Sequence, residues 1–581
     1  MLEKYPALAA VAKCIDDYFK EAHPSYFGDA PTHPVLPLKR SKVLHDNLWG
    51  TNRCSWRELA LMDSPILQRL RDIHQVGLAF QTYMSAHHTR FEHSVGVLTI
   101  ASRIFDALLR RDRDTIRNIA TVLGSNGGDI ERTVLRLRAE VRLAALLHDT
   151  GHSLYSHASE RVYSRLPMVK DASAELTRFV GKEKGAGEVL AFCIALSTSV
   201  QNLLDRAEQR LIGEESSEDY KGPISLTNVA LMIVGRGPHP YLQFLADIVS
   251  SGFDADKLDY LFRDASGAGL PLRYDLDRYL YSVRLEKNVL ADSEGELQAL
   301  YTAITASHLE RRGPVGHFKY PHYETYRLGL PQDAMNTIEQ IVLCKLMLFS
   351  YIYHHPKVRA AEGMLEKMLS RAVQLWREKG ESDDRILRHF LSATDSSLFA
   401  GFDGGLRDQI IEDHSYRIVN RLLPREVYGL GGADASHAEG VLLQLFLTDL
   451  WKRDGRDGLI RRLEQATGEE LKRLKPELDG KTWEEALLTA GVWFDVPKPP
   501  DFEDVKELVI GTAKRARAVP FTRVFPIVEW TEAYTHFRYN VRFFAFSEYW
   551  DAAVSAARTA MEQVTKISGA PFYEGIKRHR G

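Results

Sequence analysis

The chain has 581 residues, 44% of them hydrophobic and 26% charged, which is the composition of an ordinary globular protein. Its length suggests roughly two to four domains, or one large core with appendages. The formal net charge of −3 disfavours nucleic acid as the main ligand, although local basic patches remain open.

The start of the chain and its cysteines indicate the compartment. Residues 1–20 have acidic residues on both sides of a short apolar stretch and lack the features of a secretory signal. No apolar run of about eighteen residues occurs, so we expect no membrane-spanning helix. The four cysteines are far apart and form neither a zinc-finger nor a disulfide pattern. We therefore expect a cytoplasmic protein.

Helical periodicity dominates the chain. Apolar residues recur every three or four positions at 64–80, 94–111, 135–148 and 360–378. Turn-forming residues predict loops at 124–129, 213–223, 291–296 and 429–440. Short apolar runs bounded by proline predict strands at 492–500 and 523–530. The fold class is therefore mainly α, with a small α+β element near the C-terminus.

The stretch LLHDTGHSLYSH (146–157) carries the first chemical signal. His148 and Asp149 directly follow an apolar run, and burying an ionised aspartate beside a histidine is costly unless a cation compensates it. Imidazole and carboxylate together suit divalent Fe, Mn, Zn, Ni or Co. Two ligands are rarely enough, so further ligands must come from elsewhere in the chain.

Two other stretches supply suitable residues. HHTRFEHSVGV (87–97) carries His93 with Arg90 three residues earlier. SSGFDADKLDYLFRDA (250–265) is an acidic helical pattern with aspartates at 254, 256, 259 and 264. Helical spacing places Asp256, Tyr260 and Asp264 on one face.

Simpler interpretations compete with a metal site. A histidine at a helix end is more often structural than a ligand, and an acidic helix is more often a solvated face. His148 and His152 also resemble the H-E-x-x-H motif of zinc proteases. That motif fits poorly, because Asp149 replaces the glutamate base and Gly151 interrupts the helix that must present both histidines.

The order of these blocks resembles that of HD-domain metal-dependent phosphohydrolases. The similarity is greatest to the deoxynucleoside triphosphate triphosphohydrolases (dNTPases), whose succession of blocks matches 62–80, 87–97, 146–157 and 253–265. YIYHHPKVRAAEGML (351–365) resembles a later helix of that branch. The resemblance implies an HD-domain helical core at 41–365, an N-terminal extension at 1–40 and a C-terminal helical and α+β extension at 366–581.

The resemblance also implies a role for individual residues. One divalent metal (Mn, Fe, Mg, Zn, Ni or Co) would be held by His93, His148, Asp149 and Asp256. The phosphate chain would be held by Arg90, Lys257, Tyr260 and Lys345, of which the last replaces the family's usual arginine. The deoxyribose would contact Gln75, Asp264 and Tyr353. Acid–base and phosphate chemistry would fall to His152 and His157, with Glu160 orienting one of them.

One departure from the family concerns a histidine. The family has a His-Glu pair at the start of the helix after the HD motif, whereas this chain has Gly187-Glu188 or, on another alignment, Lys182-Glu183. Loss of one acid–base group commonly lowers a rate by about 10²–10⁴-fold. The sequence therefore predicts an intact metal site with weakened or altered catalysis.

Three functions follow from these observations. The leading one is hydrolysis of a deoxynucleoside triphosphate to deoxynucleoside and tripolyphosphate. The alternatives are an HD-type phosphodiesterase or nuclease, and a nucleotide-binding sensor or scaffold with weak turnover. The resemblance further implies a homo-oligomer, with a nucleotide effector at positions matching Asp63 and Arg71.

Overall fold

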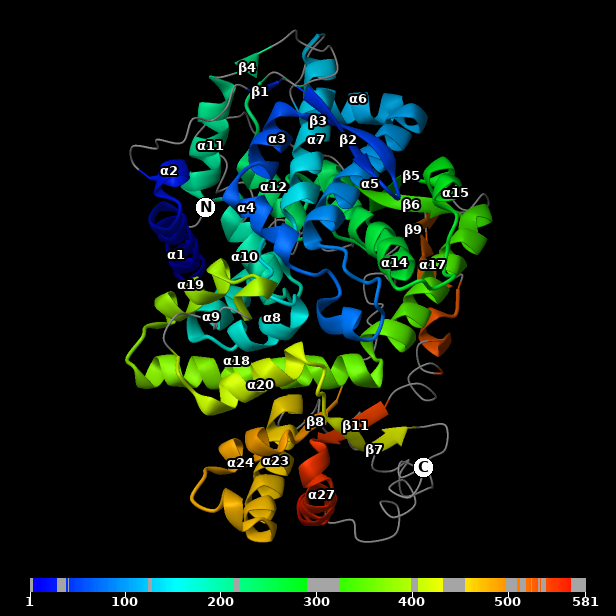
Figure 1. Ribbon diagram of the computed structural model, residues 1–581. Coiled ribbons are helices and arrows are strands. Elements are labelled where there is room, and N and C mark those ends of the chain that lie inside the picture. Colours follow the sequence, from blue (N-terminus) through cyan, green and yellow to red (C-terminus); the bar gives the residue numbers. More distant parts are fainter. Residues whose placement is uncertain are drawn as a thin grey trace.

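The computed structural model describes residues 4–28, 38–39, 41–123, 128–209, 211–212, 220, 222–289, 324–398, 406–431, 455–496, 509–511, 519–523, 525–530, 533 and 540–565. Most of these residues are in helices, and the strands form only small sheets (Figure 1). The prediction of a mainly α fold is confirmed.

Three helices form the centre of the main body. They are α5 (Arg90–Arg111), α7 (Gly128–Leu147) and α14 (Ala255–Gly267), and α5 packs against both of the others. A capping box between Thr89 and Glu92 begins α5, and the Asp254 carboxylate caps α14 by accepting the Lys257 backbone N–H at 2.7 Å. The beginnings of α5 and α14 and the end of α7 therefore have defined positions near one another.

The other helices surround this centre or form the C-terminal part of the molecule. Before α14 they are α1 (Pro6–Ala22), α2 (Pro24–Phe27), α3 (Trp56–Met62), α4 (Pro65–Gln68), α6 (Arg113–Val122), α8 (His157–Tyr163), α9 (Pro167–Val180), α10 (Ala186–Ala195), α11 (Thr198–Glu208), α12 (Leu226–Ile233) and α13 (Gln243–Val249). After α14 they are α15 (Leu276–Ser282), α17 (Met335–Leu348), α18 (Pro356–Glu378), α19 (Asp383–Ser392), α20 (Gln409–Val419), α23 (Gly455–Leu474), α24 (Trp483–Ala490) and α27 (Trp550–Thr565).

The strands pair in four small sheets. An antiparallel hairpin joins β2 (Ser41–Asp46) to β3 (Gly50–Ser55), and β1 (Leu38–Lys39) pairs in parallel with β4 (Leu211–Ile212). A four-stranded sheet has the order β10 (Val519–Pro520), β9 (Val509–Gly511), β6 (Glu324–Pro331), β5 (Arg284–Val289). A three-stranded sheet has the order β7 (Arg425–Gly431), β11 (Asn540–Ala545), β8 (Trp493–Asp495).

Two hydrophobic cores hold these elements together. The larger core runs through the main body and includes α1 of the predicted N-terminal extension, with Leu8 and Val11 fully buried. The smaller core lies between α23, α24, α27 and the three-stranded sheet. Helix α18 runs between the two parts (Figure 1), and its Arg359 forms a buried ion pair with Asp495 on β8. The division at residue 365 stays a prediction, and α18 continues through it.

Two local predictions were wrong. Residues 64–80 do not form one helix but α4, a 3-10 turn η2 (Arg69–Asp72), an extended break and a second 3-10 turn η3 (Gly77–Gln81). The break arises because the backbone at His74 bridges to Thr89, and Gly77 then takes a positive φ of 54° against the Tyr155 carbonyl. Residues 527–530 are helical rather than a strand, because Pro526 favours a first helical turn.

The remaining local predictions met mixed outcomes. The strand at 492–500 is confirmed as β8, and residues 497–500 lie outside the described residues. The predicted loop 291–296 also lies outside them, as do 124–127, 213–219 and 432–440 of the other loops. The ends of two loops belong instead to neighbouring elements, since α7 begins at Gly128 and β7 extends to Gly431.

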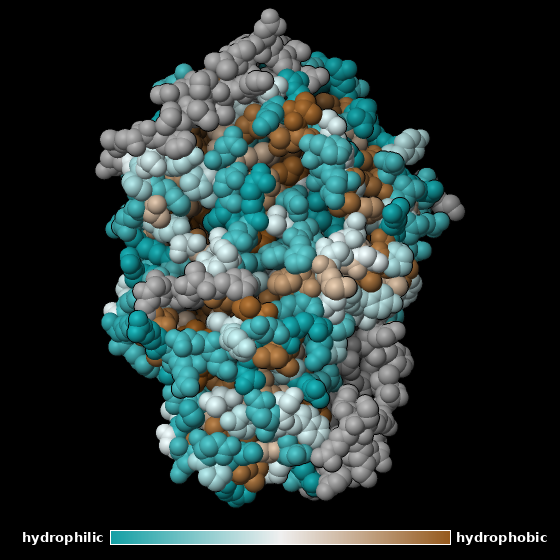
Figure 2. Space-filling view, viewed as in Figure 1, coloured by the Kyte–Doolittle hydropathy of each residue, from teal (hydrophilic) through white to brown (hydrophobic). Residues whose placement is uncertain are grey.

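The surface seen in Figure 2 is largely hydrophilic, with hydrophobic side chains in separate areas. Among the described residues, no single helix has both the length and the apolar character to cross a membrane. Helices α10 and α11 reach that threshold only together, as a pair bent by 43°.

Candidate functional site

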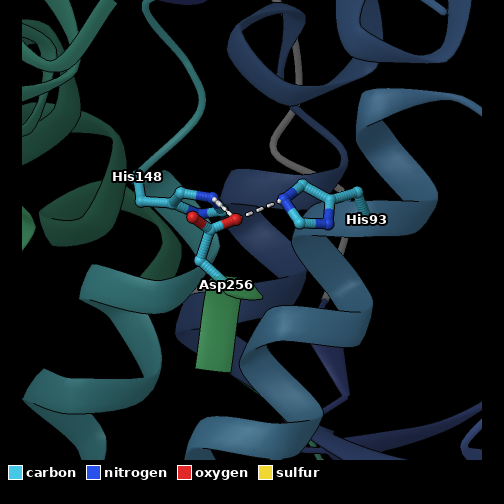
Figure 3. Close-up of side chains that lie close together, drawn as sticks. All are labelled: His93, His148 and Asp256. Carbon is cyan, nitrogen blue, oxygen red and sulfur yellow. Dashed lines mark ion pairs between the residues drawn. The ribbon is translucent and has the colours of Figure 1, made fainter. Parts of the chain in front are cut away.

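Three side chains from the three central helices point toward one another in Figure 3. His93 is in the first turn of α5, His148 follows the last residue of α7, and Asp256 is in the first turn of α14. Asp256 Oδ1 lies 3.0 Å from His93 Nε2 and 3.6 Å from His148 Nε2. One ligand atom from each of the three residues fits within a span of 4.8 Å. The structure therefore brings together three residues that span 163 positions of the sequence, from 93 to 256.

Asp149 completes the group. Its Oδ2 lies 3.6 Å from His93 Nε2, and its Oδ1 lies 3.5 Å from His148 Nε2. Burial opposes ionisation of this aspartate, but Arg90 and the surrounding histidines hold its pKa well below the ordinary value. Asp149 therefore lies beside the other three residues named from the sequence as metal ligands, within 3.6 Å of both histidines.

The outer nitrogens of both histidines fix how their rings are presented. His93 Nδ1 donates to Asp259 Oδ2 at 2.8 Å, and His148 Nδ1 donates to the Ala145 carbonyl at 2.8 Å. Both Nε2 atoms are buried and have no hydrogen-bond partner of acceptable geometry among the described residues. A histidine whose Nδ1 donates in this way presents its Nε2 lone pair to a metal. This donor set of two imidazoles and two carboxylates fits a divalent cation.

The charge balance agrees with a cation site. Burial alone would lower the pKa of His93, but the carboxylates of Asp256 and Asp259 raise it to about 10. The carboxylates therefore favour a positive charge at this point, which a bound cation also provides. The sequence alone could not identify the metal, and the donor types are compatible with several.

Asp259 supports the candidate ligand His93, a contact that the sequence analysis did not predict. It is completely buried, and besides His93 it accepts two hydrogen bonds from Arg263, at 2.7 and 3.0 Å, and one from Trp49 Nε1. Arg263 also forms an ion pair with Asp46, in which Nη2 lies 2.9 Å from Oδ2. The only signal in the sequence was Arg263 four residues after Asp259, a helical ion-pair spacing that does not show which partner the carboxylate takes.

Arg90 lies beside the candidate metal ligands and is almost fully buried. It forms an ion pair with Asp149, and its Nε donates to Ser156 Oγ at 2.9 Å. Its second terminal nitrogen, Nη2, is buried without a hydrogen-bond partner among the described residues. A buried guanidinium N–H with no protein acceptor is suited to a phosphate oxygen.

A second cluster contains His152, His157 and Glu160. Glu160 Oε2 lies 2.9 Å from His157 Nδ1 and 3.8 Å from His152 Nδ1, and His152 Nε2 lies 3.4 Å from Asp149. Burial lowers the pKa of His152 to about 3, and the positive charge of Arg90 contributes to this shift. The His152 ring is therefore neutral. Burial opposes ionisation of Glu160, but its hydrogen bond from His157 holds its pKa well below the ordinary value. The cluster is continuous with the metal ligands.

Gly187 is one of the two positions that the resemblance matches to the family's histidine. It lies in the first turn of α10, and its backbone N–H donates to Glu160 Oε1 at 2.8 Å. A Cβ atom at this position would lie 2.9 Å from His152 Cε1, and one at Gly151 would lie 2.0 Å from the Gly187 carbonyl oxygen. Gly187 therefore faces His152, and close packing leaves no room there for a side chain.

The residues matched to sugar recognition form another contact set. Asp264 accepts hydrogen bonds from Tyr353 Oη and, at 2.8 Å, from His88 Nε2. Tyr353 ends a π-helical turn, η6 (Phe349–Tyr353), and the Gln75 backbone N–H donates to the His88 carbonyl at 3.0 Å. Gln75 Oε1 is buried without a hydrogen-bond partner among the described residues. The sequence analysis assigned no role to His88, although it lies in the stretch 87–97 that carries His93.

The remaining residues predicted to bind phosphate lie on α14 and α17. Lys257 Nζ lies 2.8 Å from the Asp254 carboxylate, and Tyr260 is one turn further along α14. Lys345 is buried on α17, which leads into the turn that carries Tyr353. Their roles toward a substrate stay predictions.

The two positions matched to a nucleotide effector lie on either side of α4, Asp63 before it and Arg71 in η2. Asp63 lines a cavity of about 390 Å³ together with Tyr18, His23, Tyr26 and Gln68. Arg71 donates to Gln68 Oε1 at 3.0 Å, and its guanidinium carbon lies 3.7 Å from the centre of the Phe91 ring. The effector role of this cavity stays a prediction.

Comparisons with known proteins agree with this site. Residues 90–216 match the HD domain family, a range that contains His93, His148 and Asp149. An uncharacterised protein of Methanocaldococcus jannaschii is 24% identical over 367 residues, which cover 62% of this chain and 57% of that protein. The deoxynucleoside triphosphate triphosphohydrolase SAMHD1 of Xenopus laevis is 27% identical over 288 residues, covering 47% of this chain and 42% of the relative.

The fold also has a counterpart among solved structures. The crystal structure of a hypothetical protein from Aquifex aeolicus matches with a TM-score of 0.52 and 18% identity, covering 89% of this chain and 99% of that one. The chain spans 57% and 42% of the length of the two curated relatives above. It therefore contains an HD domain and is a homologue, at low sequence identity, of the SAMHD1 triphosphohydrolases.

Proposed function

We propose that this protein is a metal-dependent phosphohydrolase that converts deoxynucleoside triphosphates to deoxynucleosides and tripolyphosphate. The observation that carries the proposal is the pair of buried Nε2 atoms of His93 and His148. They face the carboxylates of Asp149 and Asp256, and the unpartnered Nη2 of Arg90 belongs to the same buried group. The names of the SAMHD1 relatives supply the substrate class.

The protein's own side chains would bind and orient the phosphate chain. A divalent metal held by the four ligands would polarise a phosphoryl oxygen and lower the pKa of a bound water. Arg90 would donate to a phosphate oxygen through Nη2 while Ser156 and Asp149 fix its other nitrogens. Lys257, Tyr260 and Lys345 would add further donors on the side of α14 and α17.

His157 is suited to proton transfer. Its side chain is 68% exposed, and the hydrogen bond from its Nδ1 to Glu160 leaves Nε2 as the ring nitrogen that can take up or give a proton. His152, buried and neutral, would act as a hydrogen-bond partner of the phosphate rather than as a cation.

The sugar end would be read by Tyr353. Its hydroxyl is held by Asp264, which His88 supports from the other oxygen. A tyrosine ring fixed in this way would exclude a 2′-hydroxyl group and favour a deoxynucleotide.

Gly187 favours a second candidate, a nucleotide-binding sensor or scaffold with weak turnover. The position lacks an acid–base group, and the close packing of Gly187 against His152 supports this candidate. The metal ligands and phosphate donors remain, so binding would persist where turnover is slow.

The experiment is to incubate the Mn²⁺-loaded protein with deoxynucleoside triphosphates, ribonucleoside triphosphates, cyclic dinucleotides and single-stranded DNA, and to separate the products by ion exchange. Tripolyphosphate supports the proposal, nucleoside monophosphates support a phosphodiesterase or nuclease, and saturable binding without turnover supports the sensor. His148→Ala should remove bound metal and tripolyphosphate release while circular dichroism stays helical. If metal-free His148→Ala hydrolyses as fast as the original protein, the site assignment is wrong.

The proposal extends to assembly and regulation. The cavity lined by Asp63 would bind a nucleotide effector and favour a homo-oligomer. Light scattering with and without added deoxynucleoside triphosphates measures this, and an unchanged mass with unchanged activity would contradict it.

A further inference from the structure

Asp395 lies outside residues 41–365, the part of the chain that resembles the HD-domain core, yet it contacts two segments of that core. It begins the 3-10 turn η7 (Asp395–Leu398), which follows α19, and only 2% of its surface is exposed. Its Oδ2 accepts the backbone N–H of His74 at 2.8 Å and the ring Nδ1–H of His74 at 2.6 Å. Its Oδ1 accepts the backbone N–H of Tyr155 at 2.5 Å. One buried carboxylate thus joins two separate segments of the predicted HD-domain core.

The segment held through Tyr155 has an unusual backbone. Tyr155 and Ser156 have φ angles of +47° and +59°, a conformation that residues other than glycine rarely adopt. Such a conformation persists only where the surrounding contacts determine it. His157, the proposed proton-transfer residue, follows directly and begins α8.

The segment held through His74 leads to the phosphate-binding arginine. The Ser156 hydroxyl donates to the His74 carbonyl at 2.6 Å and accepts from Arg90 Nε at 2.9 Å. Asp395 therefore holds the two segments that the Ser156–His74 hydrogen bond joins, and Ser156 is the residue that accepts from Arg90. Its carboxylate makes its hydrogen bonds among the described residues to His74 and Tyr155, not to His93, His148 or Asp256.

We propose that Asp395 is a positioning residue for the phosphate side of this site, which holds the Tyr155–Ser156 backbone so that Arg90 and His157 face the substrate. This inference rests on the proposed function for its activity readout. It assigns to the C-terminal extension a direct part in assembling the site. It also explains why a strained pair of residues is retained beside the catalytic histidine.

The chain offers a matched control in Asp72. Its Oδ2 accepts the Thr394 hydroxyl at 2.6 Å and also holds Ser396, so it anchors the same turn from outside. Asp72 is not among the partners of Tyr155, Ser156 or Arg90 given by their hydrogen bonds. Asp72→Asn would therefore loosen the turn without altering the carboxylate that holds the strained backbone.

The experiment compares Asp395→Asn and Asp72→Asn in the metal-loaded full-length protein. An asparagine oxygen cannot serve three donors, so we expect kcat to fall by about 10²-fold in Asp395→Asn, as for a misplacement of about 1 Å. Metal content should stay at the original level, and Asp72→Asn should keep near-original kcat. An unchanged kcat in both variants would overturn the proposal, as would an equal decrease of kcat in both.

Two further measurements do not depend on turnover. Hydrogen exchange of the peptide containing Tyr155 should quicken in Asp395→Asn and not in Asp72→Asn, and binding of inorganic tripolyphosphate with Mn²⁺ should weaken about tenfold. If the original protein hydrolyses nothing, the proposed function fails while these two measurements still decide the role of Asp395. Should Asp395→Asn not fold, Ser156→Ala breaks the same link to Arg90, and unchanged tripolyphosphate binding in that variant would overturn the proposal.

Discussion

Replacing Asp259 with asparagine removes the charge that orients His93. In the structure this carboxylate serves His93 Nδ1, Trp49 Nε1 and two nitrogens of Arg263, all buried. An amide oxygen cannot accept from all of these donors, and its NH₂ group would face one of them. Breaking a buried ion pair costs about 3–5 kcal/mol, and we expect the lower end because Arg263 keeps Asp46 at 2.9 Å.

The effect on metal binding is separate from this loss of stability. Removal of a hydrogen-bond partner behind a metal-bound histidine lowers metal affinity by about 10–100-fold. That factor corresponds to about 1.4–2.7 kcal/mol of binding free energy. The assay is calorimetric titration of Mn²⁺ into chelator-treated protein, with the unfolding temperature of each metal-free variant measured in parallel.

Glu58→Gln is the matched control. Glu58 is 1% exposed and receives two hydrogen bonds from the buried Arg142, at 2.6 and 2.8 Å, and that arginine keeps another partner in the Arg53 carbonyl at 2.9 Å. The control should lose similar stability and keep full Mn²⁺ affinity. If Asp259→Asn also keeps full affinity while losing stability, Asp259 does not orient the metal ligand and the reasoning fails.

Two further predictions concern packing and pH. Gly187→Ala would place a methyl group about 3 Å from the His152 ring, so we expect kcat to fall by about 10²-fold with metal content unchanged. If steady-state kinetics give the original kcat, the His152 ring can move aside and the prediction is wrong. Burial lowers the pKa of His414 to about 4, whereas the unfolded chain takes up this proton near pH 6.5. Stability should therefore fall as the pH drops from about 6.5 to 4, by up to about 1.4 kcal/mol per pH unit, and denaturant titrations of His414→Gln should show a shallower slope. An identical slope in that variant would contradict the assignment.

The sequence predicted the helical fold because helices depend on local patterns, whereas the full set of metal ligands was implied by the family resemblance and stays a prediction. Apolar residues at three- and four-residue spacing require a buried helical face, which α5, α7 and α18 confirm. The adjacent His148 and Asp149, placed directly after a buried helix, required a compensating charge. The placement of His93 and Asp256 around them is what the structure adds to that expectation.

The same local patterns failed where a tertiary contact changed the backbone. Periodicity indicated one helix over 64–80, but the bridge between His74 and Thr89 and the approach of Gly77 to Tyr155 divide it. Likewise, two alignments placed the missing histidine at residue 182 or 187, and only the packing of α10 showed that Gly187 lies against His152.

What the sequence by itself determined was therefore the chemistry available: which residues are apolar, which helices they form, and which histidines and aspartates can donate to a cation. The tertiary structure decided which carboxylate supports His93, since the aspartates of α14 are equivalent by type and differ in the residues that other segments bring against them. It also decided that Asp395 reaches Tyr155, from 240 positions away in the chain. Contacts of that range follow from how helices pack in three dimensions, and helical periodicity, which repeats every few residues, does not encode them.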